Sequence, residues 1–311
     1  MVRVFRGELT TRALRRRFLA TSGALIVVIV VATAASVTEG YSTHRYAQHW
    51  TSAPVAGFVP TPAEQAATLS ATVAYRRLIV TTAEDFSVAA SNLVTAIARD
   101  DVTGARDAYL RAQGDYDVLR PTLSAQASSS SSIDALVIDQ VPAAPAVGLH
   151  AIERDLWSST PQSATALAPA LSAQASIMPF LVSRTILTPA EICASLSELL
   201  GWTVENAIDS SQERYSHLDL VDVRAAARAA AVMVSAVAPI GALVDAASSA
   251  QLTIADGQLA ALCSRLPPSE VDTAVPSATW TDVSYLMDVV VARSGQLAGA
   301  LAGLGTGRSY A

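Results

Sequence analysis

Apolar residues recur at helical intervals through most of this chain, and that regularity leaves little room for any other kind of fold. Between residues 63 and 304 they repeat with a period near 3.6, and alternating β patterns are nearly absent. The apolar share is 51% of 311 residues and consists mostly of Ala, Val and Leu, which suits the seams of a helical bundle. We therefore expect an all-α fold of antiparallel helical bundles with a substantial core.

Prolines and polar turns divide this region into segments. The second helix is expected to stop at Pro121, because a proline inside a helix removes a backbone hydrogen bond. Residues 38–62 are polar, contain three prolines and are expected to form a tether in front of a helical domain at 63–304. The predicted helices cover residues 63–97, 104–119, 147–157, 164–184, 189–208, 217–247, 249–264 and 280–304.

Residues 1–37 have the composition of an export signal or a membrane anchor. Six arginines and one acidic residue, Glu8, precede an apolar run that ends in Ala32-Thr33-Ala34, as in a cleavable signal. Residues 15–19, Arg-Arg-Arg-Phe-Leu, fit a twin-arginine leader, and a general secretory signal with a basic flank is the alternative. Residues 21–37 also reach the lower limit for an uncleaved span. Under each interpretation the rest of the chain is expected to lie outside the cytoplasm. Any contact with the membrane is expected through this N-terminal segment.

The charged residues exclude several classes of function. The net charge is −6 although the leader is basic, so the body is strongly acidic and does not suit nucleic-acid binding. All 21 basic side chains are Arg, and a chain without Lys cannot be a Schiff-base enzyme or a P-loop NTPase. No G-x-S-x-G, H-E-x-x-H or glycine-rich phosphate loop occurs. We expect a protein that is not an enzyme.

The two cysteines, Cys193 and Cys263, lie on predicted helices 70 positions apart. Outside the cytoplasm they could form a disulfide, and unpaired core thiols are the alternative. Neither cysteine has the spacing of a thiolate metal site.

The residues best suited to bind a metal lie near His150. His150 and Glu153 are three apart on a predicted helix, so one imidazole and one carboxylate share a face. This pair is half of a mixed nitrogen and oxygen site for a transition metal, and a structural histidine is the alternative. Asp117 could face His150 if their helices pack antiparallel, because helical carboxylate proteins collect ligands from neighbouring helices. Asp134 lies between them in the sequence, and Asp115 is expected on the surface.

A second polar cluster occupies residues 212–220. Ser216 is a plausible N-cap, and Asp219 three residues later completes a capping box by analogy with Glu. His217 and Asp219 would then lie in the first helical turn, where a carboxylate suits the helix dipole. The expected role of this cluster is structural first and ligand binding second.

Taken in order, four segments of the chain resemble motifs of the imelysin-like, EfeO/EfeM-type iron-uptake proteins of bacterial cell envelopes. The resemblance covers about residues 65–304. Residues 148–157, GLHAIERDLW, are similar to the G-x-H-x-x-E motif with its Leu-Trp ending, and residues 213–220, ERYSHLDL, to the E-x-Y-S-H-x-D-L segment. Residues 105–109 and 116–121 match the helix that ends in Y-E-x-I-E-P, and residues 133–135 lie where the family has I-D-x-R.

The resemblance implies a fold of two packed four-helix bundles and a role in capturing iron, ferric or ferrous, outside the membrane. By position it assigns His150, Glu153, Asp117 and Asp134 as metal ligands, and another divalent transition metal is the alternative cargo. The implied partners are an iron permease and a haem-dependent peroxidase. The chain is a short form, because residues 38–62 are too few for the cupredoxin-like domain of longer members. The family is also labelled as metallopeptidase, although the activated-water machinery of a zincin is missing here.

Arg120 departs from the family pattern, since it stands where the second Glu of Y-E-x-I-E-P should be. A fixed cation there opposes a bare metal ion and removes one oxygen ligand. Three outcomes remain open: a weaker metal site, an anionic metal chelate whose carboxylate Arg120 holds, or an ion pair of Arg120 with Asp117 and Asp134 in place of the metal. The last outcome would leave a non-catalytic envelope scaffold, which is the alternative to an iron-binding component.

Overall fold

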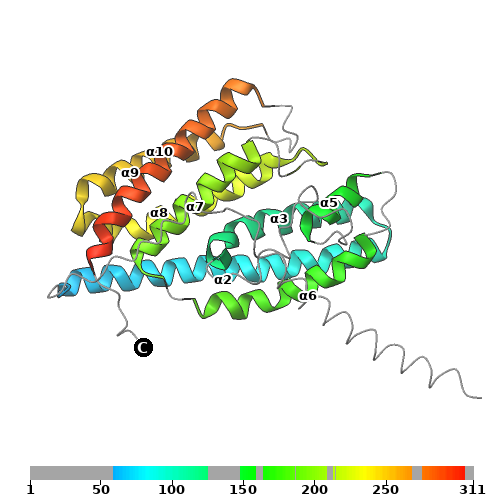
Figure 1. The fold of residues 1–311 in the computed structure, drawn as a ribbon, viewed down its shortest axis with the longest axis horizontal. Coiled ribbons are helices and arrows are strands. Elements are labelled where there is room, and N and C mark those ends of the chain that lie inside the picture. The colour runs from blue at the N-terminus through cyan, green and yellow to red at the C-terminus, as the bar shows by residue number, and fades with distance from the viewer. Residues whose placement is uncertain are drawn as a thin grey trace, which may run out of the picture. The chain divides into compact units, whose positions relative to one another are not determined.

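The computed structural model describes residues 59–124, 148–158, 164–185, 187–208, 213, 215–267 and 275–304, all within one compact unit of the chain. These ranges contain helices and turns and no strand, which confirms the all-α class (Figure 1). The predicted leader, most of the tether and Asp134 lie outside the described residues. The helices are α2 Pro62–Ala98, α3 Val102–Ser124, α5 Leu149–Trp157, α6 Ala164–Ser183, α7 Pro189–Thr203, α8 Asp219–Val244, α9 Ala246–Cys263 and α10 Ser277–Leu301.

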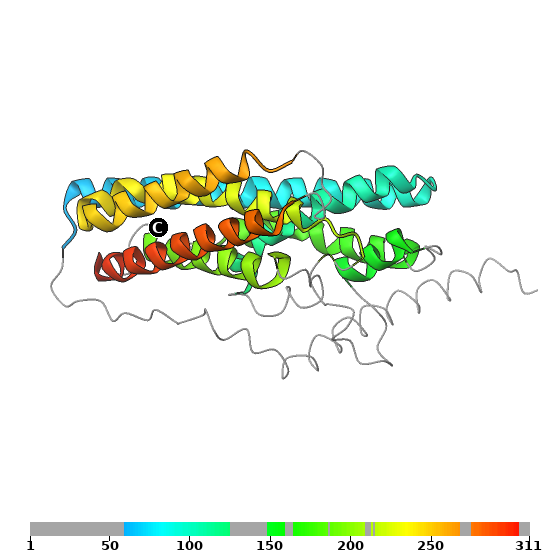
Figure 2. The ribbon, with the colours of Figure 1, turned by 90° about the horizontal axis from the view of Figure 1, so that it is seen from above.

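The longest helix, α2, connects two neighbouring sets of helices. It packs along α3 and α6, and the short α5 packs against α3 and α6. In the other set, α7 packs on α8 and α10, and α9 packs on α8 and α10, while α8 also contacts α2 and α3. At 37 residues α2 is about 55 Å long, enough to run along both sets (Figures 1 and 2). The finer expectation of two four-helix bundles remains a prediction.

The core consists of packed alanine and leucine side chains together with a few large aromatic rings. Phe86, Tyr109 and Tyr116 are among the largest fully buried side chains, and the rings of Phe86 and Tyr116 lie 5.9 Å apart. Gly114 is buried where α3 meets α8, and a Cβ added there would lie 3.3 Å from the Cβ of Ala225. The small residue therefore lets these two helices approach closely, which brings together the polar residues described below.

The ends of several helices differ from the prediction. Thr61 and Thr188 each form a capping box with a glutamate three residues later, and a proline follows each cap at the first helical position. Pro189 therefore begins α7. The prediction that the second helix stops at Pro121 is wrong, since α3 continues to Ser124. Leu119 and Leu123 are fully buried on either side of Pro121, and their packing outweighs one missing backbone bond.

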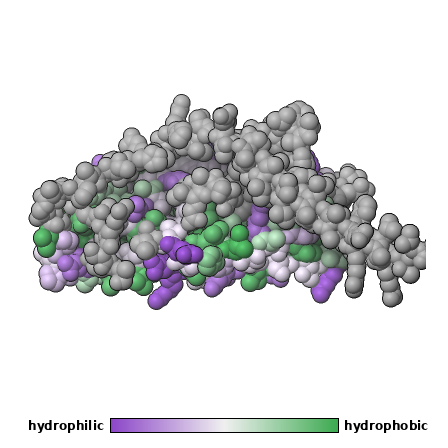
Figure 3. All heavy atoms as spheres, turned by 60° about the horizontal axis from the view of Figure 1, so that its bottom comes forward, coloured by the Kyte–Doolittle hydropathy of each residue, from purple (hydrophilic) through white to green (hydrophobic). Residues whose placement is uncertain are grey.

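Two helices, α6 and α8, are long and apolar enough to cross a membrane by length and composition alone. A buried core helix passes the same test, and α8 packs against α2, α3, α7 and α9. α6 carries exposed Ile177 and Phe180. On the face shown in Figure 3, apolar and polar residues are interspersed. The thiols of Cys193, which is buried, and Cys263, which is partly buried, are both free, so the alternative of unpaired cysteines describes this structure.

Candidate metal centre

The short helix α5 carries two of the predicted ligands into the protein interior. Gly148 precedes it with φ 83° and ψ −172°, a conformation that essentially only glycine adopts. From this start the helical spacing places His150 and Glu153 on one face, as predicted. The exposed fraction of His150 is 2% and that of Glu153 is 0%.

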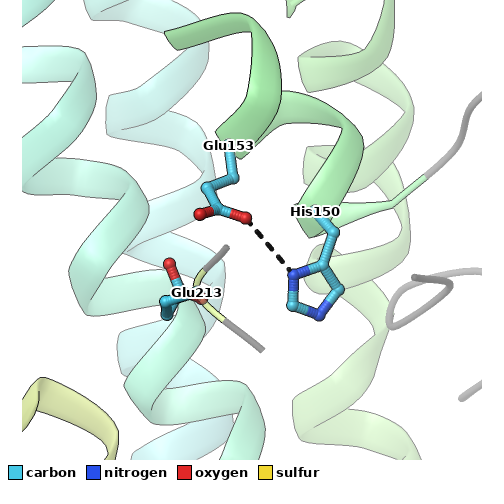
Figure 4. A group of neighbouring side chains, drawn as sticks. All are labelled: His150, Glu153 and Glu213. Atoms are coloured by element: carbon cyan, nitrogen blue, oxygen red, sulfur yellow. Dashed lines mark ion pairs between the residues drawn. The ribbon is translucent and has the colours of Figure 1, made fainter. Parts of the chain in front are cut away.

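Glu213, from the segment before α8, joins these two residues to form a group of three. One possible ligand atom from each of His150, Glu153 and Glu213 lies within 4.8 Å of the other two (Figure 4). Nδ1 of His150 is 3.6 Å from Oε2 of Glu153. All three side chains are buried, so the group has the size and the mixed nitrogen and oxygen donors of a transition-metal site.

The backbone before α8 holds Glu153 in place. Its Oε1 accepts hydrogen bonds from the backbone N–H groups of Tyr215 and Ser216, both at 2.8 Å, and from the Ser216 hydroxyl at 3.0 Å. Three donors on one oxygen fix the carboxylate, and its Oε2 is the atom that lies near His150. The arrangement orients one carboxylate oxygen toward the space between the ligands.

Two hydroxyl groups hold the Glu213 carboxyl group, and its pKa lies well above the usual value for a glutamate. The Tyr109 hydroxyl lies 3.0 Å and 3.3 Å from its two oxygens, and the Ser216 hydroxyl donates to Oε2 at 2.7 Å. Burial raises the pKa of Glu213 to about 8, and repulsion from Glu153 adds to this, whereas His150 and the two hydroxyl groups lower it. Without a cation, Glu213 therefore holds a proton at neutral pH.

Asp117 and Arg120 form a buried ion pair on α3. The guanidinium of Arg120 also lies over the ring of Trp202, and Gln113 donates a hydrogen bond to Asp117 at 3.2 Å. Asp117 is thus paired with Arg120 in the structure, while its proposed companion Asp134 falls outside the described residues. Of the four ligands that the resemblance implies, the structure brings His150 and Glu153 together and pairs Asp117 with Arg120, and Asp134 lies outside the described residues.

The start of α8 adds two further buried aspartates. Ser216 does not cap this helix, because its hydroxyl is hydrogen-bonded to Glu153 and Glu213 instead. The expected capping box is wrong, and α8 begins at Asp219 without a side-chain cap. Oδ1 of Asp219 accepts the backbone N–H of Glu213 at 3.1 Å. The pKa of Asp222 is raised well above its usual range, first by burial and then by repulsion from Asp117, Glu213 and Asp219.

This interior is far richer in acids than in bases. The group of three and the described residues around it include five buried carboxyl groups, and one buried guanidinium, that of Arg120, accompanies them. Several like charges in a dry interior are unfavourable unless protons or a cation compensate them. The donor set and its charge therefore fit a bound metal cation. The five acids are Asp117, Glu153, Glu213, Asp219 and Asp222.

Glu213 is the ligand candidate that sequence reasoning missed. It lies 60 residues beyond Glu153, and no helical spacing links the two. The available signal was its place at the head of the ERYSHLDL segment, which the sequence interpretation treated as mainly structural. The structure shows that this segment supplies a candidate ligand, the donors that fix Glu153, and the start of α8.

Comparison with known proteins adds one weak similarity. The chain is 28% identical over 126 residues to the iron uptake system component EfeM of Bacillus subtilis (strain 168). The match covers 40% of this chain and 33% of that protein, so the chain spans about a third of the length of the curated relative it matches. No family model matches the chain. The similarity points to proteins related to iron uptake.

Proposed function

We propose that this protein captures a transition-metal cation, iron in the first instance, as an exported component of an iron-uptake system. The observation that carries the proposal is the convergence of His150, Glu153 and Glu213, whose ligand atoms lie within 4.8 Å of one another in a buried acidic interior. The similarity to EfeM supports iron as the cargo.

The donor set suits capture and release rather than catalysis. One imidazole nitrogen and two carboxylate oxygens are acceptable to ferrous, ferric and other first-row cations, and three protein ligands leave further coordination positions open. The sequence lacks the H-E-x-x-H arrangement by which a zincin activates water. A non-enzymatic carrier that passes its cation to a permease, beside a haem-dependent peroxidase, is the role that we propose.

The second candidate is a helical scaffold without a metal, and the ion pair of Asp117 with Arg120 favours it. A buried guanidinium neutralises one of the five acids and occupies space beside the others. This alternative predicts that the remaining acids stay protonated and that no cation binds.

Anaerobic calorimetry with ferrous ion decides between the two candidates. We expect saturable binding at one site, a loss of at least about hundredfold in affinity for His150→Ala, and unchanged affinity for His217→Asn. His217 is an exposed histidine with φ 56°, a conformation that Asn tolerates, so it is a matched control. Absence of saturable binding to the unaltered chain would favour the scaffold.

A further inference from the structure

We propose that the centre takes its cargo as a hydrated, unchelated cation, and that Gln113 and Asp222 accept hydrogen bonds from the water molecules bound to that cation. The inference rests on the proposed function and specifies the chemical form of the cargo. It selects between two forms that the sequence left open, the bare ion and an anionic metal chelate held by Arg120.

Gln113 presents a buried acceptor on α3, one helical turn from the tyrosine that contacts Glu213. Tyr109, Gln113 and Asp117 are spaced four residues apart, so they form one stripe along α3. Tyr109 contacts Glu213, and the Gln113 amide nitrogen donates to Asp117. Gln113 is fully buried, and its Oε1 has no hydrogen-bond partner within the described part of the chain.

Asp222 presents a second such acceptor from the facing helix α8. Its exposed fraction is 2%, and its Oδ2 finds no hydrogen-bond donor among the residues that the structure describes. It lies one helical turn after Asp219, whose Oδ1 accepts the backbone N–H of Glu213, and α8 meets α3 where Ala225 faces Gly114. In either protonation state an aspartate keeps an oxygen that can accept a hydrogen bond.

A buried hydrogen-bond acceptor without a donor raises the free energy of the folded protein. Such acceptors therefore indicate which kind of ligand the site binds. A buried polar group without a partner is unfavourable, so these two acceptors favour a ligand with hydrogen-bond donors. A cation with three protein ligands retains water at its open positions, and a cation makes bound water a stronger donor. A hydrated cation satisfies the ligands and both acceptors together.

The arginines that the structure describes near the centre are already engaged, which disfavours an anionic chelate. The Arg120 guanidinium is already paired with Asp117 and stacked on Trp202. Arg106 donates twice to the carbonyl oxygen of Leu156, and Arg154 donates to Asp155. The carboxylates of a chelator would therefore meet the Gln113 Oε1 acceptor and the carboxylate of Glu153, and they would be repelled.

The first test counts water on the bound cation with Mn²⁺ as the probe. Water-proton relaxation of the Mn²⁺-loaded protein is expected to report exchangeable bound water. Gln113→Leu and Asp222→Leu, which remove the acceptors, should each weaken Mn²⁺ binding by about 10- to 100-fold, as is usual for groups that support a ligand. Asp256→Leu is the matched control, because Asp256 is a buried aspartate on α9 whose Oδ1 has no hydrogen-bond partner among the described residues. Unchanged Mn²⁺ affinity in both test variants, or no bound water, would overturn the inference.

The second test offers the cation as a chelate. Equilibrium dialysis against ferric citrate with radiolabelled citrate is expected to leave iron on the protein and citrate in solution. Stoichiometric retention of citrate with the iron would overturn the inference while leaving metal capture intact. Failure of the unaltered protein to bind Mn²⁺ or ferrous ion at all would instead overturn the proposed function, so the two failures are distinguishable.

Discussion

Glu213 shows how a single residue couples cation binding to pH. Its pKa is raised to about 8 by burial and by Glu153, so the protein without a cation holds this proton at neutral pH. A cation that binds the carboxylate must displace the proton. We predict that cation affinity rises about tenfold per pH unit between pH 6 and 8 and flattens above pH 8. Calorimetry in buffers of different ionisation enthalpy measures this slope and the released proton, and a slope near zero would contradict it.

Asp115 gives a second prediction at this scale, because it lies half-buried at the surface that the sequence predicts for it. Burial raises its pKa to about 7, and Asp85 adds to this, while Arg228 and Arg111 oppose it. A raised acid pKa means that the folded state keeps a proton that the unfolded chain loses, so this group's contribution to stability falls as the pH rises from about 4 to 7.

Replacing Asp115 by Asn should remove the loss of stability that its ionisation causes as the pH rises. We predict that Asp115→Asn unfolds at a higher urea concentration than the unaltered protein at pH 8, with a gain of about 1 kcal/mol, and shows no gain at pH 4. Asp107→Asn, on the exposed side of the same helix, is the control. An equal effect of Asp115→Asn at both pH values would contradict the prediction.

Residue spacing explains which ligands could be predicted. His150 and Glu153 share one turn of one helix, so local geometry brings them together wherever that helix lies. Arg120 lies three residues after Asp117 by the same rule, and the ion pair follows from it. Glu213 could not be assigned in this way, because its position depends on how the segment before α8 packs against α5.

At the scale of the helix, α5 depends on its first residue. Gly148 has φ 83° and ψ −172°, which is strained for any residue with a Cβ. We predict that Gly148→Ala lowers the free energy of unfolding by about 1–3 kcal/mol and also weakens cation binding, because the strain shifts the helix that carries His150 and Glu153. Chemical denaturation and calorimetry measure the two effects.

A matched change separates this backbone effect from simple loss of a glycine. Gly257 lies on the open surface of α9, where an added Cβ meets nothing within 4 Å. Gly257→Ala is expected to leave the stability unchanged or to raise it by about 1 kcal/mol, as for a glycine inside a helix. Equal stability of Gly148→Ala and Gly257→Ala would contradict the role given to Gly148.

Helix positions could be predicted well from the sequence, and helix ends less well. The periodic pattern placed each described helix within a few residues. The ends depend on interactions that the pattern does not contain: Leu123 packs beyond Pro121 and extends α3, and Ser216 bonds to Glu153 in place of capping α8. Tertiary contacts override local preference at both points.

For the whole molecule, cation binding should be visible as stability. The ligands come from α5 and from the segment before α8, so a bound cation holds together parts of the chain that separate on unfolding. A ligand at 100 times its dissociation constant stabilises the folded state by about 2.7 kcal/mol. We predict a rise in melting temperature with ferrous ion, reversal by a chelator, and no rise for Glu213→Gln. Scanning calorimetry measures all three, and an equal rise for Glu213→Gln would contradict the assignment.

The overall architecture follows from the composition of the chain. Alanine-rich periodic helices predict an all-α core, and the structure confirms it. What the periodicity could not give is the pairing of helices, because many alternative seams of Ala and Leu have similar apolar faces. The approach of α3 to α8 at Gly114 is such a pairing, and it brings this part of α3 against Ala225 and Val221 of α8.

Anomalous diffraction from a crystal grown with ferrous ion or Mn²⁺ tests the central claim most directly. We predict one strong anomalous peak within about 2.0–2.4 Å of a His150 nitrogen and of oxygens of Glu153 and Glu213. The ion pair of Asp117 with Arg120 is expected to remain in place beside it. A fully loaded crystal with no peak among these three residues, or with the metal bound at the surface, would contradict the claim that this interior is a cation-capture site.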